Sequence, residues 1–458
     1  MERKAQEYLL EWKGSAGRKP LVMRGARQVG KTHLARHFGK GHFRNVVEFN
    51  FDQHPRLERL FESGNAREIL ELAGLEKGQV PVPGETLLFL DEIQAAPEVL
   101  PKLRYFYEEL PGLHVIAAGS LLEFSRTDQP APIPAGRIEY LHLGPVSFEE
   151  FLVEVDPAGK KLLEFLEGFE FPKGLPQSVH EKLDRRYLEY LLTGGLPKIV
   201  QGFANGGTWA GVAKTQDSLL ETYQDDFAKY RGRVDNLRLR KVFHALPGMI
   251  GSKLKYAQID REETARDLRR CVDLLELARV ITRVKHSAAN AVPLGAETKD
   301  RDYKPLFIDV GLVSRTLGLT ANQLLPHPEN LPARAGLLAE QFIGQHLLYS
   351  GPGHKLPELY YWRRQAKSAN AELDYLYALD DLVVPIEVKS GKTGTLRSLH
   401  QFLAEKHSPL AVRFNRAPPS LCTIPSGPGS CQLLSLPGYF VGQMERLLRS
   451  VSHSCSIS

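Results

Sequence analysis

The residues with the most recognisable chemistry are the eight from Gly25 to Thr32, which read GARQVGKT. They follow the pattern G-x-x-x-x-G-K-[ST], with an apolar stretch before them and a helical pattern after them. In such a loop, glycines let backbone N–H groups face phosphate oxygens, the lysine reaches the β- and γ-phosphates, and the hydroxyl binds Mg²⁺. We therefore predict a nucleotide site with ATP and Mg²⁺ as cofactors. The residues expected at the nucleotide are Gly25, Arg27, Gln28, Val29, Gly30, Lys31, Thr32 and His33.

An acidic pair follows about 60 residues later, where LLFLDEIQ places Asp91 and Glu92 after four apolar residues. We expect Asp91 to hold Mg²⁺, directly or through water, together with Thr32. Glu92 is then suited to orient and deprotonate the attacking water. An apolar run ending in two acids also fits a strand that ends in a solvated turn. Downstream of a phosphate loop, the pair indicates hydrolysis of the nucleotide rather than phosphoryl transfer to a second substrate.

Two further polar residues follow the next apolar stretches. Ser120 ends a predicted strand, where its hydroxyl can sense the γ-phosphate or simply cap a helix. Arg137 follows a Pro- and Gly-rich loop, 126–137, which we expect to be mobile. It can complete a catalytic site as an arginine finger, in cis or from a neighbouring subunit, or it can be an ordinary surface arginine. A finger supplied by a neighbouring subunit would require an ATP-dependent homo-oligomer.

A second set of chemical residues lies near the C-terminus. Asp374 is on one predicted strand, and Glu387 and Lys389 are two residues apart on the next, so their side chains emerge on one face. With Glu340 on the preceding helix, they suit a divalent-metal phosphodiesterase. Alternatives are an inactive binding platform and a surface ladder of ion pairs. Basic and aromatic residues nearby suit a phosphodiester backbone: Tyr360 to Gln365, Lys392 and Arg397.

The segment 254–284 resembles a helix-turn-helix unit with a following wing. A helix is expected at 261–277, with Leu268, Val272 and Leu275 forming one buried stripe. DNA contact would use the arginines away from that stripe, Arg266, Arg269 and Arg270. Four acidic residues reduce the positive charge of this face: Glu262, Glu263, Asp267 and Asp273. A protein-docking module and a solvated amphipathic helix are therefore alternative interpretations of the segment.

These residues need elements to position them, and the first third of the chain shows a β-α-β rhythm typical of a mostly parallel sheet. Buried strands are expected at 21–25, 46–51, 86–92, 114–120 and 138–143. Helices are expected at 31–39, 56–73 and 98–110. The following helix, in SFEEFL, should begin with a capping box formed by Ser147 and Glu150.

Composition agrees with a globular protein of 458 residues and a mildly basic net charge of +5, which permits nucleic-acid contact without requiring it. No apolar run approaches the ~18 residues of a membrane span, and the first residues carry no signal-peptide core. We therefore expect a cytoplasmic protein without a membrane partner. The cysteines are too scattered for a disulfide framework or a zinc site: Cys271, Cys422, Cys431 and Cys455.

Several segments together resemble one known group, the prokaryotic AAA-type ATPases that carry a DUF4143 C-terminal region. They are GARQVGKT, LLFLDEIQ, AAGSLL, AGRIEYLHLGPVSFEEFL and GGLP, and the resemblance covers nearly the whole chain. It implies that Lys31 and Thr32 serve phosphate and Mg²⁺, that Asp91 and Glu92 serve metal and base, and that Ser120 is the first sensor. Ser120 differs from the Asn that many such proteins carry there. The resemblance also supports Arg137 as a finger, a winged-helix fold, and a PD-(D/E)xK nuclease-like core.

The predicted fold class is α/β, with an AAA+-like P-loop domain, a helical lid, a winged-helix module and an α+β restriction-endonuclease-like domain. The expected segments are ATPase 1–146, lid 147–236, winged helix 237–290, connection 291–335, nuclease-like 336–445 and a disordered tail 446–458. The leading hypothesis is an Mg²⁺-dependent ATPase coupled to a C-terminal region that binds DNA or a partner protein. The alternatives are a nucleotide switch with an inactive platform and an ATP-licensed DNA nuclease.

Overall fold

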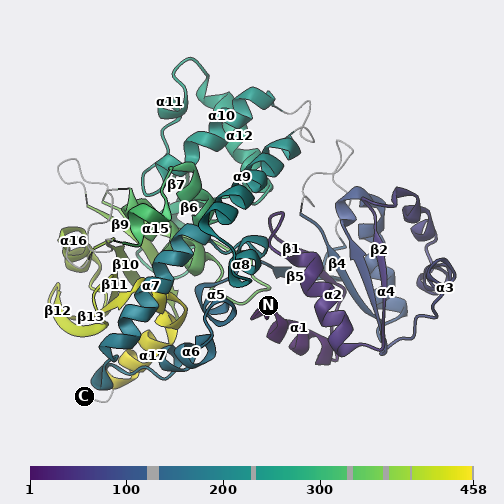
Figure 1. Ribbon diagram of the computed structural model, residues 1–458, viewed down its shortest axis with the longest axis horizontal. Coiled ribbons are helices and arrows are strands. Elements are labelled where there is room, and N and C mark those ends of the chain that lie inside the picture. Colours follow the sequence, from purple (N-terminus) through teal and green to yellow (C-terminus); the bar gives the residue numbers. More distant parts are fainter. Residues whose placement is uncertain (121–133, 228–233, 327–333, 365–370, 392–394, 456–458) are drawn as a thin grey trace. The chain divides into compact units, whose positions relative to one another are not determined.

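The structure is a computed structural model that describes residues 1–120, 134–227, 234–326, 334–364, 371–391 and 395–455 (Figure 1). Its contacts divide the chain into two compact units. The first contains residues 1–145 together with two short later segments, 277–280 and 351–357. The second contains all remaining described residues, so the expected lid helices belong with the C-terminal part of the chain.

The first unit is built on a five-stranded sheet in which every neighbouring pair is parallel, in the order β2-β3-β4-β1-β5. Its strands are β1 (Leu21–Arg24), β2 (Asn45–Asn50), β3 (Thr86–Asp91), β4 (His114–Ala118) and β5 (Glu139–His142). All residues of β3 and β4 are buried, as expected for a parallel sheet. The predicted parallel α/β fold is therefore confirmed.

Helical segments lie at the three predicted positions, 31–39, 56–73 and 98–110, and one helix before β1 was not predicted. They are α1 (Ala5–Gly14), α2 (Lys31–His42), α3 (Ala66–Lys77) and α4 (Leu103–Glu109), with 3₁₀ segments η1 (Pro55–Phe61), η2 (Ile93–Ala95) and η3 (Pro97–Lys102). The helix expected over 56–73 is in fact η1 followed by α3. Asn65 separates them because its side chain accepts hydrogen bonds from the N–H groups of Arg67 and Glu68 and so caps α3.

The second unit contains a mixed eight-stranded sheet in the order β12-β13-β11-β10-β9-β8-β6-β7. Its strands are β6 (Ile281–Ser287), β7 (Thr298–Phe307), β8 (Leu359–Arg363), β9 (Glu372–Leu379), β10 (Leu382–Val388), β11 (Leu410–Asn415), β12 (Ser420–Ser426) and β13 (Gly429–Pro437). The hairpin of β6 and β7, expected to lie in the winged-helix and connecting segments, joins this sheet because β6 pairs with β8 in parallel. The sheet therefore crosses the boundaries expected at 290 and 335.

The helices of the second unit extend from the chain's middle to its end. They are α5 (Phe148–Val155), α6 (Gly159–Glu167), α7 (Gln177–Thr193), α8 (Pro197–Ala204), α9 (Trp209–Asp225), α10 (Asn236–Ala245), α11 (Tyr256–Ile259), α12 (Ala265–Leu277), α13 (Val310–Thr316), α14 (Ala321–Leu324), α15 (Ala335–Leu348), α16 (Arg397–Lys406) and α17 (Met444–Cys455). Short 3₁₀ segments complete it at η4 (Phe171–Lys173), η6 (Leu246–Met249), η7 (Leu294–Glu297) and η8 (Gly438–Gln443). The predicted capping box of Ser147 and Glu150 is confirmed at the start of α5.

Two expectations for these helices were wrong. The helix expected from about 261 begins at Ala265, because Asp260 accepts a hydrogen bond from the N–H of Glu262 in a bend and Thr264 accepts one from the N–H of Asp267 at the start of the helix. The tail expected to be disordered from 446 is instead helix α17 up to Cys455. Four apolar side chains of α17 are buried: Met444, Leu447, Leu448 and Val451. Across the described ranges, none of the helices is both long and apolar enough to cross a bilayer.

Candidate functional site

The predicted phosphate loop lies between the end of β1 and the start of α2, where backbone geometry leaves little freedom. A Cβ at Gly25 would lie 2.3 Å from the carbonyl oxygen of Leu143, and the φ of Gly25 is +152°. Only glycine fits this close approach to the chain that follows β5. Because α2 begins at Lys31, its first unpaired N–H groups lie at the loop, which suits an anion.

Lys31 is buried within this loop, with an exposed fraction of 8%. Its Nζ donates hydrogen bonds to the carbonyl oxygens of Gly25 (2.9 Å) and Ala26 (2.8 Å). Burial lowers the pKa of Lys31 to about 8, although the carboxylates of Glu92 and Asp91 act in the opposite direction. A phosphate at this position would compensate the buried ammonium with a full negative charge, which two carbonyl dipoles do not supply.

Thr32 and Asp91 meet as the sequence predicts. The Oγ1 of Thr32 donates to the Oδ1 of Asp91 at 3.0 Å, and the Nδ2 of Asn50 donates to Oδ2 at 3.1 Å. Burial and the neighbouring Glu92 raise the pKa of Asp91, and the Thr32 bond opposes them. A hydroxyl beside a destabilised carboxylate is a donor set that fits Mg²⁺. The sequence did not reveal Asn50, which reaches Asp91 because β2 and β3 pair Asn50 with Asp91.

Glu92 follows directly at the end of β3, in the left-handed region with φ 52°. The Nε2 of Gln94 donates a short hydrogen bond to the Oε2 of Glu92. This contact fixes one oxygen of the carboxylate that we predicted to activate water. Sequence patterns gave no signal for Gln94, because the contact depends on the left-handed turn at Glu92.

Other loop residues have structural partners. The backbone oxygen of Val29 accepts a hydrogen bond at 3.0 Å from Arg3, a buried side chain that also bonds the carbonyl oxygens of Gly144 and Pro145. Arg3 thus ties the phosphate loop to the chain after β5, a role that the sequence did not indicate. Arg27 is half-buried, while Gln28 and His33 are exposed.

The two more distant predicted residues differ in their surroundings. Ser120 is 4% exposed, and its hydroxyl has no hydrogen-bond partner among the described residues. Arg137 is half exposed, and its Nε donates to the Oε1 of Glu108 on α4 at 2.8 Å. Part of the predicted mobile loop, 126–133, lies outside the described residues.

Comparison with known families identifies this unit, because residues 17–152 match the AAA domain family. The chain contains an AAA-type ATPase domain. Two further matches are to domains of unknown function, DUF8612 at 184–323 and DUF4143 at 335–417. The predicted combination of an AAA domain with DUF4143 is confirmed.

Solved structures similar to the chain include a Walker-type ATPase of Pyrococcus abyssi, which is 16% identical with a TM-score of 0.42 and covers 69% of this chain and 95% of that one. The RuvB Holliday junction branch migration motor of Thermotoga maritima is 13% identical with a TM-score of 0.30, covering 61% and 88%. AMPPCP-bound DnaA from Aquifex aeolicus is 16% identical with a TM-score of 0.27, covering 59% and 86%. No curated protein matches the chain.

The C-terminal carboxylates come together in the second unit around a residue that the sequence did not reveal. Lys304, on β7, lies 3.3 Å from Glu340 and 3.9 Å from Asp374, measured from its Nζ to the nearest carboxylate oxygens. Glu372 adds a third carboxylate at 2.7 Å. Glu372 and Asp374 are two residues apart on β9 and so share one face of the sheet, which could have indicated Glu372 from the sequence. We call these four residues the carboxylate centre.

Glu387 and Lys389, also predicted for this site, form a close ion pair with each other at the end of β10. Asp374 accepts a hydrogen bond from the N–H of Val388 at 2.7 Å, which places it beside this pair. Burial and the Asp374 charge raise the pKa of Glu387, and Lys389 opposes them. Among the described residues, no group of three or more His, Cys, Asp or Glu side chains has an arrangement that could hold a metal ion.

The side chains expected to contact a phosphodiester backbone are largely occupied elsewhere. Tyr361 and Trp362 are buried, with exposed fractions of 0% and 3%. Arg363 pairs with Asp302, and Arg364 pairs with Glu405 at 2.6 Å. Arg397 is exposed at the start of α16, whereas Gln365 and Lys392 lie outside the described residues.

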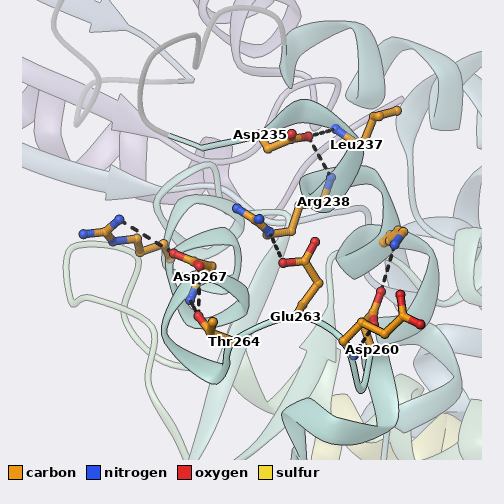
Figure 2. Close-up of polar contacts among 10 residues, drawn as sticks. Asp235, Leu237, Arg238, Asp260, Glu263, Thr264 and Asp267 are labelled. Carbon is orange, nitrogen blue, oxygen red and sulfur yellow. Dashed lines mark hydrogen bonds and ion pairs between the residues drawn. The ribbon is translucent and has the colours of Figure 1, made fainter.

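Charged residues around α10 and α12 are also paired with each other (Figure 2). Asp235 accepts from the N–H groups of Leu237 and Arg238 and caps α10, and the Arg238 guanidinium lies 2.8 Å from Glu263. Lys241 pairs with Asp260 at 2.8 Å. The predicted stripe is buried: Leu268, Val272 and Leu275. Of the predicted DNA-contacting arginines, Arg266 and Arg270 are exposed, Arg269 is half-buried, and Arg270 lies 3.8 Å from Asp267.

Proposed function

We propose that the AAA domain hydrolyses ATP in a Mg²⁺-dependent reaction at the β1–α2 loop. The observation that carries this proposal is the 3.0 Å contact between the Thr32 hydroxyl and Asp91, with Glu92 as the next residue. Bound Mg²⁺ would neutralise charge on the phosphates. Lys31 would exchange its two loop carbonyls for phosphate oxygens, and Thr32 and Asp91 would provide the metal's protein ligands.

Glu92 would accept the proton of the attacking water. One of its oxygens is bonded to Gln94, so the other stays available for that water. Ser120, buried without a partner among the described residues, would donate to the γ-phosphate. The unsatisfied hydroxyl supports this role, because a buried polar group without a partner is costly.

Arg137 would act from a neighbouring copy of the chain, in an ATP-dependent homo-oligomer. Its side chain is half exposed, lies over the ring of Tyr107 and pairs with a surface carboxylate, Glu108, in an ion pair that water screens strongly. Arg137 can therefore leave Glu108 for the phosphates of a nucleotide bound to another subunit at little cost in free energy.

The C-terminal region would bind a partner protein or DNA under control of the nucleotide. The short segment 351–357, which directly precedes β8, belongs to the first unit, where Gly353 accepts a hydrogen bond from the N–H of His142 on β5 at 2.7 Å. This connection offers a route from the ATPase sheet to the C-terminal sheet. The pairing of basic side chains around α10, α12 and β8 supports a protein partner over direct DNA contact. The same pairing favours a nucleotide switch with an inactive binding platform over an ATP-licensed nuclease.

The test is ATP hydrolysis by wild type, Lys31→Ala and Lys40→Ala, each with Mg²⁺ and with a chelator. Lys40 is an exposed lysine of the same helix and controls for loss of a positive charge. We expect Mg²⁺-dependent turnover in wild type and Lys40→Ala, and at least a ~100-fold loss in Lys31→Ala. Equal turnover in all three would exclude this site.

The same assay tests the position of Arg137. Lys31→Ala and Arg137→Ala each lack one part of a shared site, so a mixture of the two should regain turnover if the arginine acts in trans. A mixture no more active than the sum of its components would exclude that arrangement.

A further inference from the structure

The ammonium of Lys304 lies where three carboxylates converge in the second unit. Its side chain is only 2% exposed, and its Nζ lies 2.7 Å from Glu372, 3.3 Å from Glu340 and 3.9 Å from Asp374. The aromatic ring of Tyr361 closes another side, with its centroid 5.0 Å from Nζ. The lysine is therefore surrounded by groups that favour a positive charge.

This ammonium is fixed in place by the surrounding charges. A buried lysine without partners would be expected to lose its proton, because burial penalises the charged form. Here three carboxylates favour the charged form of Lys304 more than burial penalises it. Moving the ammonium away would leave several negative charges together in a poorly solvated site. A side chain held in this way competes directly with any cation that needs the same oxygens.

Lys304 comes from a different part of the chain than its partners. It lies on β7, within the 184–323 match to DUF8612, whereas Glu340, Glu372 and Asp374 lie within the 335–417 match to DUF4143. The two matched segments share one sheet, in which β7 is an edge strand reached through β6 and β8. The cation of the carboxylate centre is thus provided by the neighbouring segment.

We propose that Lys304 is the resident cation of the carboxylate centre and occupies the place that a divalent metal takes in a metal-dependent phosphodiesterase. The residues predicted as ligands do not fit a metal ion as they stand. Glu340 and Asp374 share the Lys304 ammonium, and Glu387 is paired with Lys389. The carboxylate centre therefore holds no catalytic metal, and this holds whether or not the AAA domain hydrolyses ATP.

The test is calorimetric titration of Mn²⁺ into the full chain without nucleotide, in an Asp91→Asn background that removes a predicted metal ligand of the AAA domain. Lys304→Met removes the ammonium and keeps an unbranched side chain. Lys253→Met is the matched control, because Lys253 forms an ion pair with Asp302 at 2.9 Å in the same unit. Thermal unfolding with and without Mn²⁺ provides a second readout.

We expect no Mn²⁺ site in the Lys304-containing chain or in Lys253→Met, and one new site in Lys304→Met that raises its unfolding temperature. Adding Glu340→Gln to Lys304→Met should abolish the gained site. A folded Lys304→Met chain that binds no Mn²⁺ would overturn the proposal. If Lys304→Met does not fold, Mn²⁺ titration of the chain that retains Lys304 tests the proposal instead. A Mn²⁺ site lost on Glu387→Gln would overturn the proposal, and the lack of any site would support it.

Discussion

Glu92 and Asp91 are each held by an uncharged neighbour, and these neighbours shape the proposed chemistry at the residue scale. Gln94 bonds one oxygen of Glu92, and Asn50 bonds one oxygen of Asp91. The Thr32 hydroxyl contacts both oxygens of Asp91 as well, so Asp91 is positioned from two sides. An amide donor holds a carboxylate without neutralising it, as a base and a metal ligand both require.

Replacing Gln94 with Leu should lower kcat for ATP about 5- to 10-fold and leave KM within about twofold, because Glu92 loses its orientation but no ATP-binding group is removed. Steady-state kinetics measures both constants. Gln79→Leu is the matched control, since the Gln79 side chain is exposed and accepts a hydrogen bond from Asn45 at 3.4 Å. A Gln94→Leu enzyme with wild-type kcat would show that the contact has no role in positioning Glu92.

At the scale of elements, the GGLP segment between α7 and α8 depends on one buried carboxylate, Asp309. Its Oδ2 accepts from the N–H of Gly195 at 2.7 Å, and its Oδ1 caps α13 by accepting from Leu312 at 3.1 Å. Gly194 has φ +73°, and a Cβ there would lie 2.0 Å from the Oδ1 of Asp309. The two glycines thus allow the backbone to close over Asp309.

Gly194→Ala should lower the free energy of unfolding of the second unit by about 3 kcal/mol, because it adds a clash with a buried carboxylate to left-handed backbone strain. Gly206→Ala is the control, since Gly206 has φ +83° and open space around it, so that only the strain of about 1 kcal/mol applies. Denaturant unfolding followed by circular dichroism measures both. Equal losses in the two variants would contradict the role given to Asp309.

Elements with strong local patterns could be predicted from the sequence, and those that depend on distant pairing could not. The buried runs of β1, β3 and β4 and the loop from Gly25 to Thr32 carry their own signal. The joining of β6 to β8 depends on strands more than 70 residues apart, and it brings Lys304 to Asp374. Helix α17 was missed although its apolar residues follow helical spacing.

At the scale of the whole molecule, the chain joins an AAA-type ATPase domain to a unit whose charged side chains are largely paired. Short segments from the second half of the chain, 277–280 and 351–357, belong to the first unit, so the chain passes repeatedly from one unit to the other. This path supports the proposed coupling of ATP hydrolysis to partner binding. Cytoplasmic location and oligomerisation stay predictions.

We propose that Asp91 and Glu92 divide metal binding and water activation at a working ATPase site. The most direct measurement compares Mg²⁺–ATP binding and hydrolysis in wild type and Glu92→Gln. We predict that Glu92→Gln binds Mg²⁺–ATP within about threefold of wild type but hydrolyses it at least ~100-fold more slowly, because an amide cannot accept the proton of water. Wild-type hydrolysis by Glu92→Gln would contradict the account.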